Sequence, residues 1–132
     1  MKLVSWNVNG IRAVHKKGLF TPMVEQLQPD VICLQETKAT QGDVDIKQLE
    51  ELGFHHHWFS AQKKGYSGVA IFSKIKPDNI CIGCGIPSSD NEGRVIQADF
   101  GDIRLINAYF PSGTSGDERQ AFKYIWLDEF HA

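Results

Sequence analysis

The stretch VICLQETK, residues 31–38, decides the fold because it changes character within a single strand. Its first four residues are apolar, as in a strand that is covered on both faces. Glu36 and Lys38 then follow before any glycine or proline marks a turn. The sequence therefore predicts a strand that starts in the core of a sheet and ends at a polar rim.

Strand signals dominate the rest of the chain. Short runs rich in β-branched and aromatic residues, bounded by turn residues, predict strands. The expected strands cover residues 3–8, 31–36, 56–60, 68–73, 94–100 and 103–110. The step from Phe100 through Gly101 and Asp102 to Ile103 predicts a tight hairpin between the last two.

Three helices are expected between and after these strands. The first begins at Thr21 as its N-cap, with Pro22 at the first helical position. The second covers residues 43–52 and ends at Gly53. The third begins near Asp117 and continues to residue 132. Strands and helices together predict the α/β class, which some schemes would call α+β.

The central strand needs a covering layer on each side. Ile32 and Leu34 point one way while Val31 and Cys33 point the other, because side chains alternate along a strand. Helices can cover one face of the sheet, but 132 residues leave little chain for the second cover. We therefore expect either half of a larger sandwich or a chain that depends on a partner.

Composition and charge narrow the class of protein. The chain has 132 residues, 42% of them hydrophobic and 23% charged, which suits one globular domain. No run approaches the roughly 18 apolar residues of a membrane span, and no signal-peptide pattern opens the chain. We therefore expect a cytoplasmic protein without a membrane partner. A net charge of -2 gives no general sign of a nucleic-acid binder.

Cysteine and histidine spacing does not indicate a metal site. An odd count of three cysteines argues against a disulfide scaffold, and the pair Cys81 and Cys84 lacks the second pair that a zinc site needs. His55, His56 and His57 alternate along an expected strand, so they cannot all face one metal ion. We interpret both groups as packing or surface residues.

Polar side chains end several of the strands and can meet at one rim. Asn7 and Asn9 share a face of their strand by the two-residue period, and the same period places Glu36 on the face of Leu34. Tyr109 ends the last strand. If these strands are neighbours, an amide, a carboxylate and a phenol converge there.

These residue types suit metal-assisted hydrolysis of a phosphoester. The Glu36 carboxylate and the Asn7 amide offer the oxygen ligands that Mg²⁺ and Mn²⁺ prefer. Tyr109 can donate a hydrogen bond to a phosphate oxygen. Each residue also has a structural interpretation: Glu36 as a salt-bridge partner, Asn7 as a turn residue, and Tyr109 as a half-buried aromatic.

Five stretches, in this order, resemble the exonuclease III-like AP endonucleases of the endonuclease/exonuclease/phosphatase superfamily. They are SWNVNGIRA at 5–13, PDVICLQETK at 29–38, GYSGVAIFSK at 65–74, EGRVIQADF at 92–100 and LINAYFPSG at 105–113. The resemblance covers nearly the whole chain. It implies half of a four-layer αββα sandwich of the DNase I-like type, with mixed or antiparallel sheets and flanking helices.

The resemblance implies a role for each matching residue. Asn7 and Glu36 match metal-site residues, and with Tyr109, which matches the tyrosine at the scissile phosphate, they form the implied catalytic set. Asn9 and Lys38 would support the metal site. Residues in segments that contact DNA in the family are Arg12, Lys38, Tyr66, Arg94 and Ser112, the last where some members carry Asn.

Two segments of the family are not found in the sequence. One is a Gly-Asp-x-Asn segment with the catalytic aspartate, and the other is a Ser-Asp-His segment with the catalytic histidine, which His131 does not match. The resemblance therefore implies that residues 1–132 form the N-terminal half of such a domain. The missing C-terminal half or a second chain would cover the sheet, and we expect the chain alone to be inactive or nearly so.

The implied whole protein is a DNA-repair nuclease that depends on Mg²⁺, with Mn²⁺ as the alternative metal. It would act as an AP endonuclease and 3′–5′ exodeoxyribonuclease on duplex DNA with abasic sites, cutting 5′ to the lesion and leaving a 3′-hydroxyl. One alternative is a non-catalytic remnant that binds DNA or a partner. Another is a phosphodiesterase of the same superfamily that acts on RNA, phosphoinositides or lipid head groups.

Overall fold

The structure, a computed structural model, describes residues 2–40, 46–111, 123 and 126. Its elements in chain order are β1 (Leu3–Asn7), α1 (Ile11–Lys16), α2 (Phe20–Leu27), β2 (Val31–Gln35), α3 (Ile46–Glu51), β3 (His55–Phe59), β4 (Val69–Ser73), β5 (Asn79–Ile82), α4 (Pro87–Asp90), β6 (Val95–Phe100) and β7 (Ile103–Ala108). No helix in the described ranges is both long enough and apolar enough to cross a membrane.

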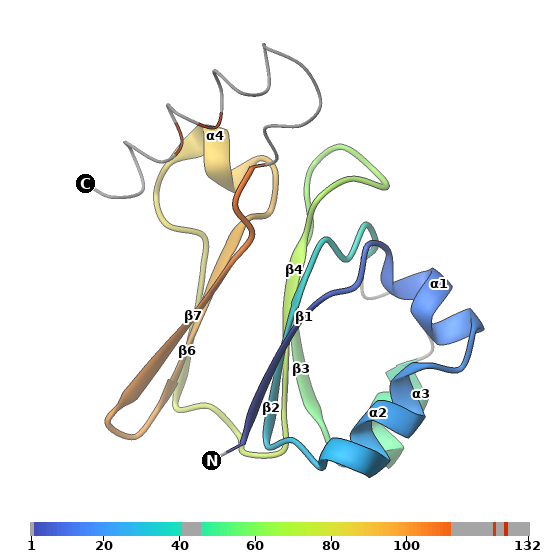
Figure 1. Cartoon of the computed structure of the whole chain (residues 1–132). Helices are drawn as coiled ribbons and strands as arrows, with labels where there is room; N and C mark the ends of the chain where they lie inside the picture. The colour runs from blue at the N-terminus through green and yellow to red at the C-terminus, as the bar shows by residue number, and fades with distance from the viewer. Residues whose placement is uncertain (1, 41–45, 112–122, 124–125, 127–132) are drawn as a thin grey trace.

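The strands form two stacked sheets. The first has the order β1-β2-β4-β3, with β1 and β2 parallel and the other neighbours antiparallel. The second has the order β5-β6-β7 and is antiparallel throughout. Helices α1, α2 and α3 lie on one face of the first sheet, and the second sheet lies on its other face (Figure 1). The predicted α/β class is confirmed.

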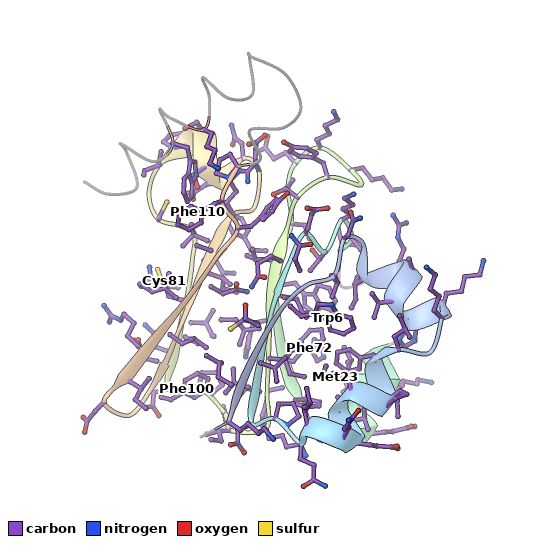
Figure 2. All side chains as sticks on the ribbon, viewed as in Figure 1. Trp6, Met23, Phe72, Cys81, Phe100 and Phe110 are labelled. Atoms are coloured by element: carbon purple, nitrogen blue, oxygen red, sulfur yellow. The ribbon has the colours of Figure 1, made fainter. Side chains whose placement is uncertain are left out.

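The central strand β2 is buried on both faces, as its sequence predicts. Ile32 and Leu34 belong to the core on the helix side. Val31 and Cys33 belong to the core between the two sheets. Figure 2 shows Trp6, Met23 and Phe72 on the helix side and Phe100 between the sheets. The alternation of apolar residues along β2 therefore separates two cores.

The expectation that 132 residues leave little chain for a second cover of the central sheet is wrong. The second sheet is that cover, because Ile96, Ala98 and Phe100 of β6 pack against the inter-sheet face of β2 and β4. The periodicity of a strand does not distinguish one sheet from two, and the strands of this chain divide into two. The apolar surface that stays open lies one layer further out, where Ile106 and Phe110 are about half exposed.

Helix boundaries differ from the predicted ones. Helix α2 begins at Phe20, with Leu19 as an N-cap that makes no side-chain bond, so Thr21 is not the cap. Pro22 fits in the first turn because backbone N–H groups there have no partner within the helix. Helix α3 does end before Gly53, whose φ of +87° suits glycine, while residues 43–45 lie outside the described residues.

The predicted third helix lies mostly outside the described residues. Of its expected range, Lys123 and Trp126 are described, and both are helical. The Trp126 ring is buried and its centroid lies 4.9 Å from that of Phe110. The predicted hairpin is confirmed, since Phe100 pairs with Ile103 and Gly101 has a φ of +59°.

Two glycines with the same backbone conformation test the packing of this fold. Gly93 and Gly101 have φ of +58° and +59°, so alanine meets the same strain of roughly 1–2 kcal/mol at both. A Cβ on Gly93 would lie 2.6 Å from the carbonyl carbon of Ser60, whereas one on Gly101 meets nothing within 4 Å. We expect Gly93→Ala to lose a further ~1–3 kcal/mol of unfolding free energy in urea denaturation. Equal losses in the two variants would contradict this packing.

Candidate active site

Parallel pairing of two strands creates the candidate site. In the ladder of β1 and β2, Asn7 lies opposite Gln35, so both strands end at the same edge of the first sheet. Glu36 follows directly. The end of β7 in the second sheet brings Tyr109 to this edge from the other layer. The structure thus brings together Asn7, Glu36 and Tyr109, as the sequence predicts.

Glu36 lies on the opposite face from the predicted one. Its phenol partner Tyr109 packs in the inter-sheet core, whereas Leu34 belongs to the core on the helix side. The reason is local: Glu36 has a φ of +59°, a left-handed conformation that ends the strand and its two-residue period. The turn therefore directs the carboxylate between the sheets.

The Glu36 carboxylate accepts three contacts. Tyr109 Oη donates to Oε1 over 2.6 Å, and Asn7 Nδ2 donates to the same oxygen over 3.4 Å. Lys38 Nζ lies 3.3 Å from Oε2. Two neutral donors and one cation thus surround a single carboxylate, which fixes its orientation.

These contacts favour the ionised carboxylate beside a neutral phenol. Burial of Glu36 acts to raise its pKa, but hydrogen bonds from Tyr109, Lys38 and Asn7, with the charge of Lys38, outweigh burial and lower that pKa below the usual 4.5. Burial raises the pKa of Tyr109, and the bond to Glu36 and the Glu36 charge raise it further. The proton therefore stays on Tyr109.

Asn9 and Lys38 hold Asn7 and Glu36 in this arrangement, while their support of a metal site stays a prediction. Lys38 Nζ donates to Asn9 Oδ1 over 2.7 Å, so the ammonium bridges Asn9 and Glu36. The Asn9 backbone N–H donates to Asn7 Oδ1 over 3.1 Å. The amide oxygen of Asn7 is thereby occupied and its nitrogen faces Glu36. A role for Asn7 as an oxygen ligand stays a prediction and requires this amide to turn over.

Arg94 is buried. Its side chain is 1% exposed, and its guanidinium donates to Glu92, to the Tyr109 carbonyl oxygen over 3.1 Å and to Tyr66 Oη over 3.4 Å. It also lies 5.0 Å from the centroid of the Tyr109 ring. In this structure Arg94 offers no surface to DNA, because Glu92 and the two tyrosines enclose it.

The other predicted DNA contacts have mixed outcomes. Arg12 is exposed on α1, and its Nη2 donates to the Lys38 carbonyl oxygen over 3.3 Å, close to the site. Tyr66 is partly buried beside Arg94, with Lys63 Nζ 5.3 Å from its ring centroid. Ser112 lies outside the described residues. DNA contact by these residues stays a prediction.

No role was predicted for Glu92, Gln35 and Asn107. Glu92 is the ion-pair partner of Arg94, at 2.9 Å. Gln35 Nε2 donates to Asn107 Oδ1 over 2.8 Å, which links the two sheets next to the site. For Gln35 and Asn107 the sequence did carry a signal. Each is an amide at the end of an apolar strand, and a buried polar group of this kind needs a hydrogen-bond partner.

The structure gives the surroundings of the cysteine and histidine groups. All three cysteines are free, and burial raises the pKa of Cys33 to about 12. His56 accepts from Trp58 Nε1 over 3.1 Å and lies 3.7 Å from Glu50. Within the described ranges, no cluster of three or more His, Cys, Asp or Glu side chains could hold a metal ion.

The lowered pKa of Glu36 predicts a pH dependence of stability. A carboxyl whose pKa is lower in the folded state stabilises the fold above its usual pKa of 4.5 and loses that contribution as the pH falls through the folded value. We expect Glu36→Gln to reduce the fall in unfolding free energy below about pH 4.5. Urea denaturation across acidic pH measures it, with exposed Glu25→Gln as the control. Identical slopes for wild type and Glu36→Gln would contradict the prediction.

Comparisons with known proteins agree with this geometry. The family model described as "Endonuclease/Exonuclease/phosphatase family" matches residues 4–131. The chain is 43% identical over 126 residues to a Bacillus subtilis "Exodeoxyribonuclease", covering 96% of the chain and 49% of that protein. It is 41% identical over 134 residues to a Dictyostelium discoideum "DNA-(apurinic or apyrimidinic site) endonuclease", covering 100% of the chain and 37% of that protein.

The solved structures include an AP endonuclease from Archaeoglobus fulgidus, with a TM-score of 0.82 and 28% identity over 98% of the chain and 49% of that structure. The chain thus spans half or less of the length of these relatives. The resemblance noted in the sequence is confirmed. Since the family model matches almost every residue and the fold is shared, the chain belongs to the endonuclease/exonuclease/phosphatase family.

Proposed function

We propose that the chain is the N-terminal half of a DNA-repair nuclease that acts as an AP endonuclease and 3′–5′ exodeoxyribonuclease. The observation that carries the proposal is the ionised Glu36 carboxylate held by Tyr109 and Lys38 at the joined rim of two sheets. The relatives named as an exodeoxyribonuclease and an AP endonuclease support the substrate class. A DNA substrate also fits the cytoplasmic location expected from the sequence, which stays a prediction.

The donor set fits a hard divalent cation such as Mg²⁺, with Mn²⁺ as the alternative. Glu36 is kept ionised, as a ligand must be, and Mg²⁺ often binds through one or two carboxylates together with waters and substrate phosphate. Glu36 would hold the ion, and Asn7 would join it after turning its amide. The ion would neutralise charge on the phosphate.

Tyr109 and Lys38 have roles that do not need the ion. Tyr109 is a neutral donor at the rim, and when its single hydroxyl proton turns from Glu36 it can donate to a phosphate oxygen placed there. The side chain of Lys38 is 37% exposed, so it can meet an incoming phosphate while its ammonium holds Asn9 and Glu36. Together they would orient the scissile group.

Completion of the site would need the rest of the domain. The described residues supply one carboxylate to the rim and no general base that reaches it. The half-exposed apolar residues on the outer face of the second sheet, and the edge of β7 that pairs with no other described strand, offer surface for a further part of the chain. We propose that this further part is the other half of the domain, and that the two halves together act on abasic duplex DNA.

A chimeric nuclease tests the proposal. We expect the chain alone to show little or no incision of abasic duplex DNA with Mg²⁺. Joined to the half of the Bacillus subtilis relative that it does not match, it should incise, and Tyr109→Phe should slow the single-turnover rate by ~10²-fold through loss of one donor. Glu36→Gln should abolish incision.

The controls separate catalysis from folding. Glu25→Gln, on the exposed face of α2, should leave incision unchanged. Circular dichroism should be the same for all variants. Strong incision by the chain alone, or incision by the chimera that survives Glu36→Gln, would overturn the proposed site. A chimera that folds and binds abasic DNA without cutting it would instead favour the non-catalytic alternative.

The salt dependence of DNA binding tests whether Arg12 contacts DNA beside the site. Arg12 is exposed beside the site, and each neutralised phosphate contributes a slope of roughly −0.9 to log K against log salt. We expect Arg12→Ala in the chimera to weaken binding and to reduce that slope by ~1. Fluorescence anisotropy between low and moderate salt measures both quantities. Lys76→Ala, exposed in the connection between β4 and β5, should leave the slope unchanged, and an equal effect there would contradict a localised DNA surface.

A further inference from the structure

We propose that Asn107 is a positioning residue whose buried amide sets the register between the two sheets, so that Tyr109 meets Glu36. The proposal rests on the proposed function only in treating that pair as catalytic. Asn107 does not itself reach the rim. It acts through the strand that carries Tyr109.

The Asn107 amide is bonded almost completely. The residue is 3% exposed, and its Nδ2 donates to the carbonyl oxygens of Leu34 at 3.0 Å and Ala70 at 2.9 Å. Its Oδ1 accepts from Gln35 Nε2 at 2.8 Å. Both amide hydrogens and the amide oxygen are used. All three bonds cross from β7 to the first sheet, where Leu34 and Ala70 are themselves paired across β2 and β4.

These bonds lie next to the catalytic pair in both sheets. Asn107 and Tyr109 are two residues apart on one face, which is about 7 Å along a strand. Their partners Gln35 and Glu36 are consecutive in the first sheet. The bonds from Gln35 to Asn107 and from Tyr109 to Glu36 are therefore successive cross-links, which we call the inter-sheet seam.

Apolar packing alone cannot supply this precision. The inter-sheet core contains Ile96, Ala98 and Phe100, and burial of such side chains is non-directional. A slide of about 1 Å would cost apolar contacts little, but it would stretch hydrogen bonds of normal length beyond their useful range. Buried and fully bonded amides therefore favour one placement of the two sheets.

Other contacts of Tyr109 do not make this link. Arg94 donates to the Tyr109 carbonyl oxygen and lies against its ring, but it reaches the first sheet only through a 3.4 Å bond to Tyr66, in the connection between β3 and β4. Ser5 Oγ accepts from Gln35 Nε2 at 3.1 Å, which steadies Gln35 on the first sheet. Asn107 joins these two layers directly beside the site.

A pair of isosteric variants tests the role of Asn107. Asn107→Val and Asn107→Thr have the same shape and differ in one hydroxyl, which can accept from Gln35 and donate to one carbonyl. The readout is the hydroxyl proton of Tyr109 in NMR spectra, assigned by its absence in Tyr109→Phe. We expect Asn107→Val to lose this protected proton and Asn107→Thr to restore at least half of its intensity.

A second destabilised variant separates positioning from stability. Phe100→Leu weakens the same core at the hairpin end, away from the seam (Figure 2). It should keep the Tyr109 hydroxyl proton even where its unfolding free energy falls as much as that of Asn107→Val. If Asn107→Val does not fold, Gln35→Met removes the same cross-link from the first sheet and should give the same loss. Retention of the proton in folded Asn107→Val or Gln35→Met would overturn the proposal.

The experiment also separates this inference from the proposed function. The hydroxyl proton is observed without metal or DNA. Mn²⁺ titration of the same variants adds a second measurement: if Glu36 binds the ion, Asn107→Val should weaken binding several-fold and Asn107→Thr should recover it. A wild-type chain that binds no Mn²⁺ would count against the metal site, while the proton signal would still decide the role of Asn107.

Discussion

The hydrogen bond from Tyr109 to Glu36 joins residues that are 73 positions apart in the chain, and it depends on the packing of the rest of the structure. The bond forms only if the two sheets stack, and they stack because β2 and β4 are apolar on both faces. The carboxylate can lie between the layers as an anion because Lys38 offsets its charge. Arg94 in turn holds the backbone and ring of Tyr109. One polar contact thus depends on the packing of two cores.

Strained backbone conformations occur at the same rim of the first sheet. Asn9, Glu36 and Lys38 all have positive φ, which costs roughly 1–2 kcal/mol for each side-chain-bearing residue. Backbone bonds between the loops compensate, from Gly10 to Glu36 at 2.8 Å and from Lys38 to Ser67 at 2.8 Å. Each loop therefore holds its neighbours in a conformation that none favours alone. Strain of this kind just after two neighbouring strands is typical of a site that orients polar groups for a ligand.

Much of the fold could be predicted from residues 31–38 and their period, including the two-faced core and the polar rim. The division into two sheets could not, because apolar alternation specifies that a strand is covered but not by which layer. The face of Glu36 was mispredicted because its left-handed backbone breaks the two-residue period of the strand. Helix α1 was not among the helices expected from the sequence. It has no side-chain cap, and its first turn is held by tertiary bonds such as that from Ile11 N–H to the Thr37 carbonyl oxygen, so the sequence around it carries only weak helix signals. Arg94 was expected in a segment that contacts DNA, and its burial was not predicted because its partner Glu92 gives no sequence signal of burial.

The layer that carries Tyr109 also exposes apolar side chains. Ile106 of β7 is about half exposed, and so is Phe110, which directly follows Tyr109 beyond the end of β7. Figure 2 shows Phe110 on the outer side of that sheet, with Cys81. Ile106 and Asn107 lie on opposite faces of β7, so a segment that covered Ile106 would pack behind the strand whose inner face bonds to the first sheet. Covering the outer face would therefore bury the back of the strand that carries Asn107 and leads to Tyr109.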